Sequence, residues 1–242
     1  MKKVRIYQSG NYTTGHTIEL SPTASQHVGI VLRMQAGDPL TLFCGDNREF
    51  SATITAVHKK KVMVVIHDVH TVNRESPRAI HLAQAISKGE RMELVIQKAV
   101  ELGVASITPL FTSRCVVRLD AERLAKKQLQ WQAIAIAACE QSGRNTLPTI
   151  HPACPLDIYL PQAHASLKLV LHPNLNKSWR DYHFPEGDIA LLIGPEGGLS
   201  EDEVHMATSH HFQPLCLGPR ILRTETAAIA ALSMLQAISG DL

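Results

Sequence analysis

The sequence predicts an α/β protein of two parts, a short, mostly β module followed by a parallel sheet with flanking helices. The first seventy residues read as short strands separated by turns, and after Glu75-Ser76-Pro77 strands and helices alternate along the chain. The later strands are almost wholly apolar, which is typical of parallel strands buried on both faces. The 242 residues suffice for one or two domains, and we expect domains at residues 1–72 and 73–242.

The first module is expected to be a small β-barrel or sandwich. Its predicted strands occupy residues 4–7, 39–43, 50–57 and 61–69. Gly37-Asp38 and Gly45-Asp46 punctuate these strands, and the regular spacing indicates an all-β arrangement. One helix is expected over residues 21–34, where apolar residues recur at helical spacing.

The second part begins with a predicted strand over residues 79–86. A helix follows it, and Ser87 with Glu90 has the Ser-x-x-Glu form of a capping box at its start. A strand at 107–110 and a long helix at 121–139 come next, and further apolar strands are predicted at 167–171, 189–193 and 215–217. In a parallel sheet the ligand lies beyond the carboxyl ends of the strands, so the turns after the last three strands are the candidate site.

Composition excludes several classes of protein. Hydrophobic residues at 45% and charged residues at 19% are ordinary globular values, which excludes a disordered or fibrous chain. The longest apolar run, residues 133–139, is far shorter than the roughly 20 residues of a membrane span. The N-terminal residues are basic but lack the apolar core of a secretion signal, so we expect a cytoplasmic protein that does not contact a membrane.

Cysteine and histidine spacing predicts no metal site. The five cysteines are odd in number and dispersed, so neither a disulfide framework nor a zinc knuckle is indicated. The 13 histidines offer only His67-x-x-His70 and His210-His211 as close pairs, and surface or core positions explain these pairs better than metal binding does.

The net charge of +2 conceals an asymmetry between the two ends of the chain. Residues 1–150 carry 19 Lys and Arg against 12 Asp and Glu, whereas residues 151–242 carry 5 against 10. A polyanion would therefore be met mainly by the first 150 residues, although a solvated surface explains any single basic cluster better. The clusters are Lys59-Lys60-Lys61, Arg74 with Arg78, Lys88 with Arg91, Arg114 with Arg118, and Arg123 with Lys126 and Lys127.

The turn after the strand at 189–193 is rich in glycine. It reads Gly194-Pro195-Glu196-Gly197-Gly198-Leu199 and leads into a second capping box, Ser200 with Glu203. Three glycines would let the backbone approach a flat ligand closely. A phosphate cradle is the rival interpretation, but neither Gly-x-x-x-x-Gly-Lys nor Gly-x-Gly-x-x-Gly is present, and Glu196 would repel a phosphate. For this loop alone, a tight structural turn is the plainer explanation.

The turns after the other two strands carry further candidates. Ile221 and Leu222 are adjacent apolar residues in a polar turn, so they could form a wall for an aromatic ring or pack in the core. Arg223 lies just before a predicted helix, where the helix dipole disfavours a cation, and this indicates an anionic or carbonyl partner. His172 follows the strand at 167–171, where a structural histidine is the commoner case.

Three segments in this order, Leu171-His172-Pro173, Ile193–Gly198 and Leu217–Thr226, resemble the motifs of the trefoil-knotted SPOUT RNA methyltransferases. Gln97–Gly103 and Ala137–Arg144 are similar to the RsmE branch, which methylates N3 of a specific uridine in 16S ribosomal RNA. The resemblance covers essentially the whole chain. It implies a PUA-like, RNA-binding β-barrel followed by a C-terminal parallel sheet with a trefoil knot.

The resemblance also implies the ligands and partners. Three loops of the knot would hold S-adenosylmethionine in a bent form, and the substrate would be 16S rRNA in the small ribosomal subunit, with no metal involved. The protein would be a homodimer, with the small-residue helix at 227–238 as a candidate interface. The matching cofactor-binding positions are Leu171, His172, Gly194, Glu196, Gly197, Leu217, Gly218, Ile221 and Leu222.

The implied chemistry is displacement at a sulfonium methyl by uracil N3, which must lose its imide proton. Negative charge then spreads onto the flanking carbonyl oxygens, where a guanidinium would stabilise it. Arg223 is the first candidate for this role and Arg144 the second. Glu140 or Glu225 could accept the proton, although a helix cap or an ion pair explains either carboxylate as well. Basic residues within 114–127 would position the RNA backbone together with the first module.

Two other functions stay open on the sequence. A noncatalytic RNA-binding or ribosome-assembly protein would use the β module and would need the α/β part only for dimerisation, so it predicts no cofactor affinity. A SPOUT enzyme that methylates another RNA atom, such as a ribose 2′-hydroxyl or a guanine nitrogen, would keep the cofactor and change only the substrate.

Overall fold

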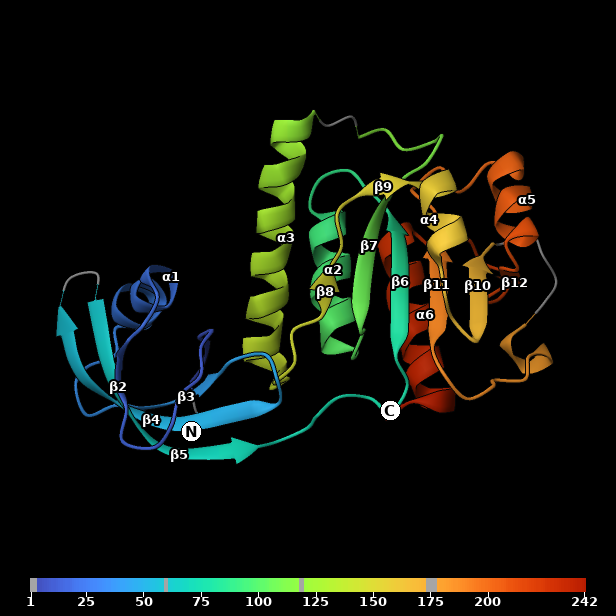
Figure 1. Ribbon diagram of the computed structural model, residues 1–242. Coiled ribbons are helices and arrows are strands. Elements are labelled where there is room, and N and C mark those ends of the chain that lie inside the picture. Colours follow the sequence, from blue (N-terminus) through green and yellow to red (C-terminus); the bar gives the residue numbers. More distant parts are fainter. Residues whose placement is uncertain (1–3, 59–60, 118–119, 173–177) are drawn as a thin grey trace. The chain divides into compact units, whose positions relative to one another are not determined.

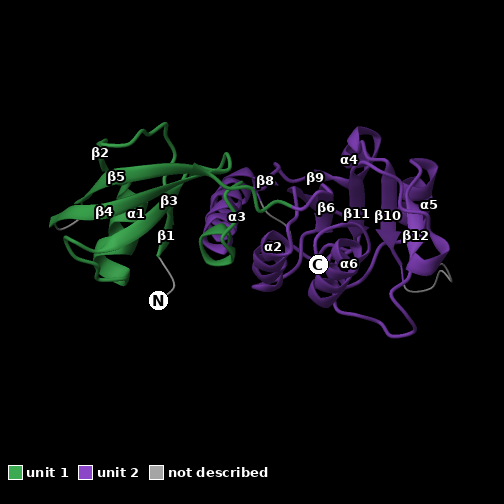
Figure 2. Ribbon diagram, turned by 90° about the horizontal axis from the view of Figure 1, so that it is seen from below, with its two compact units in different colours: residues 1–75, 139–147 green, residues 76–138, 148–242 purple. Residues whose placement is uncertain are grey.

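The computed structural model describes residues 4–58, 61–117, 120–172 and 178–242, and it divides the chain into two compact units (Figure 2). Unit 1 consists of residues 1–75 and 139–147, and unit 2 of residues 76–138 and 148–242. Lys59, Lys60, Arg118 and Pro173, which the sequence analysis named, lie outside the described residues.

Unit 1 is built on one five-stranded mixed sheet with the order β1-β3-β4-β5-β2. Its strands are β1 (Arg5–Tyr7), β2 (Thr17–Glu19), β3 (Pro39–Phe43), β4 (Arg48–His58) and β5 (Lys61–Thr71). β1 pairs with β3 in parallel and every other pair is antiparallel. Alternate residues such as Leu42, Phe50 and Val64 are fully buried, because the side chains of a strand point to opposite faces and one face forms the core. The predicted β module is therefore confirmed, with the short strand β2 in addition.

The expected helix over residues 21–34 is shorter and irregular. α1 (Pro22–Gln26) begins at a cap where Ser21 Oγ accepts a hydrogen bond from the amide of Ala24, and a π-helical turn, η1 (His27–Val31), replaces its continuation. Arg33 then takes a positive φ of 54°, which ends helical geometry. The predicted helix is therefore confirmed for residues 22–31, although it ends three residues early and its second half is π-helical, because apolar spacing reports which residues share a face and not the hydrogen-bond pattern behind it.

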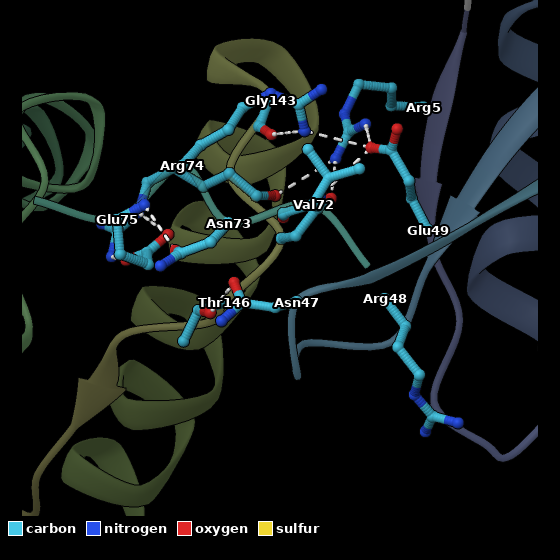
Figure 3. A network of polar contacts seen from close by, with 12 residues as sticks. Arg5, Asn47, Arg48, Glu49, Val72, Asn73, Arg74, Glu75, Gly143 and Thr146 are labelled. Atoms are coloured by element: carbon cyan, nitrogen blue, oxygen red, sulfur yellow. Dashed lines mark hydrogen bonds and ion pairs between the residues drawn. The ribbon is translucent and has the colours of Figure 1, made fainter. Parts of the chain in front are cut away.

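A partly buried polar network joins residues 139–147 to the sheet of unit 1 (Figure 3). The Glu49 carboxylate accepts hydrogen bonds from Arg5 at 2.9 Å, Arg74 at 3.0 Å and Asn145 at 3.1 Å. Burial alone would raise the pKa of Glu49, but these donors outweigh it and hold the pKa at about 2. The charged groups inside unit 1 are thus paired, and the segment 139–147 supplies part of the pairing.

Unit 2 contains a seven-stranded sheet in which every pair is parallel (Figure 1). The order is β12-β10-β11-β6-β7-β8, with β9 also paired to β7. The strands are β6 (Ile80–Ala85), β7 (Ser106–Phe111), β8 (Thr149–Ile150), β9 (Cys154–Pro155), β10 (Leu167–Leu171), β11 (Ile189–Ile193) and β12 (Gln213–Leu215). All five residues of β11 are buried, as expected for a central parallel strand covered on both faces.

Helices cover both faces of this sheet. They are α2 (Arg91–Glu101), α3 (Ala121–Ser142), α4 (Leu156–Gln162), α5 (Glu201–Ser209) and α6 (Thr224–Ser239), with a short 3-10 turn η2 (Trp179–Asp181). Figure 2 shows α2 and α6 on one side of the sheet and α4 and α5 on the other. The parallel α/β architecture predicted from the sequence is therefore confirmed.

Two local expectations in unit 2 differ from the structure. α2 begins at Arg91, and its N-cap residue Glu90 makes no side-chain cap hydrogen bond. The Ser87 hydroxyl instead points to the carbonyl of Ala85, so the capping box predicted there does not form. The last strand occupies 213–215 and not 215–217. The second predicted capping box is confirmed, since Ser200 and Glu203 bind each other's backbone amides at the start of α5.

Candidate functional site

A cavity of about 360 Å³ lies in unit 2 at the carboxyl ends of the parallel strands. Its walls come from the loops that follow β10, β11 and β12, from the start of α6 and from Arg114 in the loop after β7. A parallel sheet brings these segments to one edge although the sequence separates them widely. The volume falls within the roughly 300–1,000 Å³ of small-molecule sites.

The structure brings all nine residues named as cofactor-binding from the sequence to this one cavity. Leu171 and His172 line it from the end of β10, Gly194, Glu196 and Gly197 from the loop after β11, and Leu217, Gly218, Ile221 and Leu222 from the loop after β12. Four other cavities in the described residues each lack at least one of these three loops.

The loop after β11, residues 194–199, is folded tightly on itself. A side chain at Gly194 would place its Cβ 2.9 Å from the amide nitrogen of Leu199, closer than real Cβ contacts, so only glycine fits there. The amide of Gly198 donates to the carbonyl of Pro195 at 2.9 Å and closes a turn. The buried hydroxyl of Thr224 donates to the carbonyl of Gly194 at 2.8 Å and ties the loop to the start of α6.

Glu196 is held by the segment that precedes α2. Its Oε1 accepts hydrogen bonds from the backbone amide of Lys88 at 3.0 Å and from Arg91 Nη1 at 2.7 Å. Burial would raise the pKa of Glu196, but these hydrogen bonds and the charge of Arg91 outweigh it and keep the pKa below its ordinary value. Glu196 therefore presents an ionised carboxylate at the rim of the cavity.

Arg114 is a part of this site that the sequence analysis did not assign to it. Its Nη1 donates to the carbonyl of Gly197 at 2.9 Å and lies 3.3 Å from the carbonyl of Leu199. The sequence signal was a basic cluster, which gave no reason to connect Arg114 with a glycine loop more than eighty positions later. Only the pairing of β6 with β7 and β11 brings the two segments together.

The loop after β12 is far more open. Gly218 takes a φ of +118°, a conformation that favours glycine, and a Cβ built on it would meet nothing within 4 Å. Ile221 lines the cavity but is 86% exposed, whereas Leu222 is half-buried. Of the two residues expected to form an apolar wall, Leu222 is thus the better enclosed.

The start of α6 holds Arg223, the first candidate catalytic residue. Arg223 is the N-cap residue of α6 and is exposed, and no protein group within the described ranges pairs with its guanidinium. The next residue but one, Glu225, has a side chain only 13% exposed, and its buried Oε2 has no hydrogen-bond partner in the described part of the chain. Arg91 Nε lies 3.9 Å from Glu225 Oε1, so the Arg91 guanidinium is near two carboxylates, those of Glu196 and Glu225.

Arg144 and Glu140, the other two candidate catalytic residues, belong to unit 1 and are engaged there. The Arg144 side chain is 5% exposed and forms an ion pair with Glu75, to which its Nε donates at 3.1 Å. Glu140 accepts a hydrogen bond from the amide of Tyr7 at 2.9 Å, and burial raises its pKa. Both side chains therefore serve the interior of unit 1.

The basic residues at the start of α3 are also paired within the protein. Arg123 lies 3.4 Å from Asp120, Lys126 lies 2.7 Å from Glu122, and Lys127 lies 3.0 Å from Glu93. Their positive charges are partly neutralised, which weakens the expectation that this stretch positions an RNA backbone.

Two further observations concern the described residues as a whole. No group of three or more His, Cys, Asp or Glu side chains among them is arranged to hold a metal ion. None of the helices in this part of the chain combines the length and the apolar character that crossing a bilayer requires.

Comparison with known protein families places this fold and cavity in a class. Residues 74–236 match the RNA methyltransferase domain, and residues 21–66 match the RNA methyltransferase PUA domain. These two matches define the chain as an RNA methyltransferase.

Similar proteins narrow the class. The ribosomal RNA small subunit methyltransferase E of Buchnera aphidicola is 38% identical over 98% of this chain and 97% of its own. The structure of that enzyme from Neisseria gonorrhoeae, bound to S-adenosyl methionine, is 39% identical with a TM-score of 0.92 and covers 99% of both chains. A methyltransferase from Legionella pneumophila in complex with the bound cofactor SAM is 59% identical with a TM-score of 0.98 and covers 100% of both. The chain belongs to the ribosomal RNA small subunit methyltransferase E (RsmE) family.

Proposed function

We propose that the protein transfers a methyl group from S-adenosylmethionine to N3 of a specific uridine in 16S ribosomal RNA. The observation that carries the proposal is the convergence of three strand-end loops on one cavity at the carboxyl edge of the unit 2 sheet. Membership of the RsmE family and the two similar structures that hold the cofactor support it.

The cavity suits S-adenosylmethionine in size and in the groups it offers. Leu199, Leu217 and Leu222 offer apolar surface for an adenine ring, and the close-packed backbone of residues 194–198 offers amides and carbonyls to its polar edge. Glu196 is ionised and paired with Arg91, so its charge is partly neutralised within the protein. We therefore assign the nine cavity residues named above to cofactor binding.

When bound, the cofactor supplies a methyl group on a sulfonium that is already activated for displacement, so the protein needs no metal. The tasks left to the chain are to align the base and to favour the loss of its N3 proton. We assign Arg223 to the second task, because its guanidinium has no partner among the described residues and its two neighbours in sequence, Leu222 and Thr224, line the cavity, which Arg223 itself does not. There it would stabilise negative charge on a carbonyl oxygen of the base.

The other catalytic candidates are ranked by their surroundings. Arg144 is almost fully buried against Glu75, and Glu140 caps the amide of Tyr7, so both are better explained as structural groups of unit 1. Glu225 retains a buried carboxylate oxygen with no hydrogen-bond partner in the described residues, which makes it the stronger candidate for proton acceptor.

The remaining parts of the proposal concern architecture and partners. We assign residues 1–72 to a PUA-like barrel that binds RNA, and residues 73–242 to a methyltransferase domain whose C-terminal loops form a trefoil knot. We further propose a homodimer of this chain. Thr226, Ala230 and Met234 form an accessible stripe on α6 beside a groove that Trp179 also lines, and small side chains there would allow close approach of a second copy.

Calorimetric titration with S-adenosylmethionine tests the cofactor assignment. We expect micromolar binding by the wild-type protein and none by Gly197→Arg, because an arginine side chain at position 197 would fill the cavity beside Arg114. A folded wild-type protein that does not bind would favour a noncatalytic RNA-binding protein.

Methylation of ribosomal subunits tests the substrate. Small subunits from a strain that lacks the gene should accept one methyl group, and mass analysis of RNA fragments should place it on N3 of a uridine. Subunits from the parent strain, which are already methylated, are the control. A methyl group on a ribose or on guanine would replace the proposed target by another RNA atom and leave the cofactor site intact.

A further inference from the structure

The Arg114 side chain reaches from the loop after β7 to the glycine loop after β11. One nitrogen, Nη1, lies 2.9 Å from the carbonyl oxygen of Gly197 and 3.3 Å from that of Leu199. Hydrogen bonds from a charged donor are stronger than neutral ones, and both acceptors belong to the backbone that lines the cavity. Arg114 thus holds the backbone of the glycine loop at two carbonyl groups, those of Gly197 and Leu199.

The backbone around Arg114 is itself anchored, so the side chain starts from a fixed point. The amide of Ser113 donates to Glu203 Oε1 at 2.6 Å, and Glu203 is the buried carboxylate of the capping box that starts α5. On the other side, Cys115 Sγ donates to the carbonyl of Ile86 at 3.0 Å. The β7 loop and the segment from Gly194 to Glu203 are therefore interlocked through side chains from both.

The identity of residue 197 is explained by Arg114. A Cβ built on Gly197 would lie 3.3 Å from Arg114 Cβ, which is tighter than most real contacts, and at an ordinary van der Waals distance of 3.6 Å from Arg114 Cδ. Gly197 does not have the positive φ that favours glycine. The lack of a side chain at position 197 therefore makes room for the stem of Arg114.

We infer that Arg114 is a positioning residue that holds residues 196–199 in the shape that binds the cofactor. A loop with three glycines loses much backbone entropy on ordering, and contacts from outside the loop must offset that loss before a ligand arrives. This inference rests on the proposed function, because it presumes that the cavity binds S-adenosylmethionine. It replaces the expectation that Arg114 contacts the RNA backbone.

The geometry favours the positioning role. Of the five N–H donors of a guanidinium, Arg114 directs those of Nη1 at two carbonyl oxygens of its own chain. Arg114 should therefore affect cofactor affinity and leave RNA affinity unchanged.

Cofactor affinity is the first test, measured by calorimetry with S-adenosylhomocysteine so that no turnover is involved. Arg114→Ala should bind at least about tenfold more weakly, the scale of one hydrogen bond from a charged group. Arg114→Lys should recover most of that loss, because a single nitrogen serves both carbonyls and an ammonium can replace it. Arg123→Ala, an exposed arginine on α3, is the matched control and should bind like the wild type.

Steady-state kinetics separates positioning from a general loss of structure. Arg114→Ala should raise KM for the cofactor about tenfold and leave KM for ribosomal subunits and kcat within about threefold. A variant that lowers subunit affinity while cofactor affinity is unchanged would overturn the inference and return Arg114 to the RNA interface.

A double-mutant cycle with Gly197→Ala provides a readout without any ligand. Amide hydrogen exchange of residues 196–199 should become faster in Gly197→Ala and in Arg114→Ala, and the effect of Gly197→Ala should be much smaller when Arg114 is already absent. Additive effects would show that the glycine does not serve Arg114 and would contradict the inference.

The two hypotheses fail differently. If the wild-type protein binds no cofactor, the proposed function fails, and the exchange cycle still decides whether Arg114 shapes the loop. If the wild-type protein binds and Arg114→Ala binds equally well, only the positioning role fails.

Discussion

The two loops that face each other across the cavity differ in how firmly the protein holds them. Residues 194–199 after β11 are bound by Thr224, by Arg114 and, through Glu196, by Arg91 and the amide of Lys88. Residues 218–223 after β12 include an isoleucine that is 86% exposed and an arginine whose guanidinium has no partner among the described residues. One wall of the cavity is fixed in advance and the other is open.

This difference suggests that the two sides of the cavity have different functions. A wall fixed before the ligand arrives lowers the entropy that binding must overcome, so the β11 loop is suited to cofactor affinity. A group that stays unpaired until a second molecule arrives can act on that molecule alone, so Arg223, which follows the cofactor-binding residues of the β12 loop, is suited to the substrate base. Substitutions of the cavity-lining loop residues should change cofactor binding, and substitution of Arg223 should change turnover.

The largest effect is expected at Arg223, on the open wall. Arg223→Ala should lower kcat by roughly 100-fold or more and leave cofactor affinity within about tenfold, because it removes an interaction made mainly in the transition state. Turnover on small ribosomal subunits and calorimetry measure the two quantities. Arg123→Ala, an exposed arginine on α3 that does not line the cavity, is the control for general electrostatic effects. Unchanged turnover would remove Arg223 from the mechanism and with it the proposed difference in function.

The next effect is expected at Thr224, which ties the fixed wall to α6. Its buried hydroxyl donates to the carbonyl of Gly194 and accepts from Gln84 Nε2 at 3.0 Å. Thr224→Val keeps the volume and leaves both groups unsatisfied, so the free energy of unfolding should fall by about 1–3 kcal/mol. Urea denaturation measures this change. Thr226→Val, exposed on the same helix, should stay within about 0.5 kcal/mol. Equal stabilities for the two variants would show that Thr224 does not hold the loop.

A smaller effect is expected when Glu196 is titrated. The folded-state pKa of Glu196 is below its ordinary value. The stabilisation that the ionised carboxylate gives to the loop is therefore present above about pH 4.5 and is lost as pH falls through the folded-state pKa. Cofactor affinity of the wild-type protein should therefore weaken several-fold below about pH 4.5, whereas Glu196→Gln should start weaker and change less. Calorimetry across this range should show the two curves converging at low pH. Parallel curves would mean that the charge of Glu196 does not hold the loop.

The smallest effect on stability is expected at Ile221. Because this side chain is 86% exposed, Ile221→Ser should change the free energy of unfolding by no more than about 0.5 kcal/mol, and it should weaken S-adenosylmethionine binding a few-fold because Ile221 lines the cavity. Leu222→Ser, at a half-buried position, should destabilise the protein more and provides the comparison. A marked loss of stability in Ile221→Ser would show that the open wall closes over Ile221 in solution.

The sequence predicts those features whose cause is local. The apolar runs at 167–171 and 189–193 match β10 and β11, and the Ser200 capping box forms, because burial on two faces and a cap leave direct traces in neighbouring residues. The position of the cavity was predictable once the strands were recognised, because the carboxyl ends of parallel strands meet at one edge of the sheet.

The features that the sequence analysis missed depend on contacts between distant segments. The role of Arg114 follows from strand order, which spacing along the chain does not reveal. The inclusion of residues 139–147 in unit 1 depends on Asn145, which reaches Glu49 across the intervening chain. The candidate catalytic residue Arg144 was attractive because its segment resembles a family motif, yet its side chain is paired with Glu75.

The participation of residues 139–147 in unit 1 has a consequence for the timing of synthesis. Domains generally begin to fold as they emerge from the ribosome, the N-terminal one first. Residues 1–75 emerge early with Arg5, Glu49 and Arg74 in place, but Asn145 is added only after residues 76–138 have been made. The polar network around Glu49 in unit 1 can therefore form completely only after the middle of the chain has been synthesised.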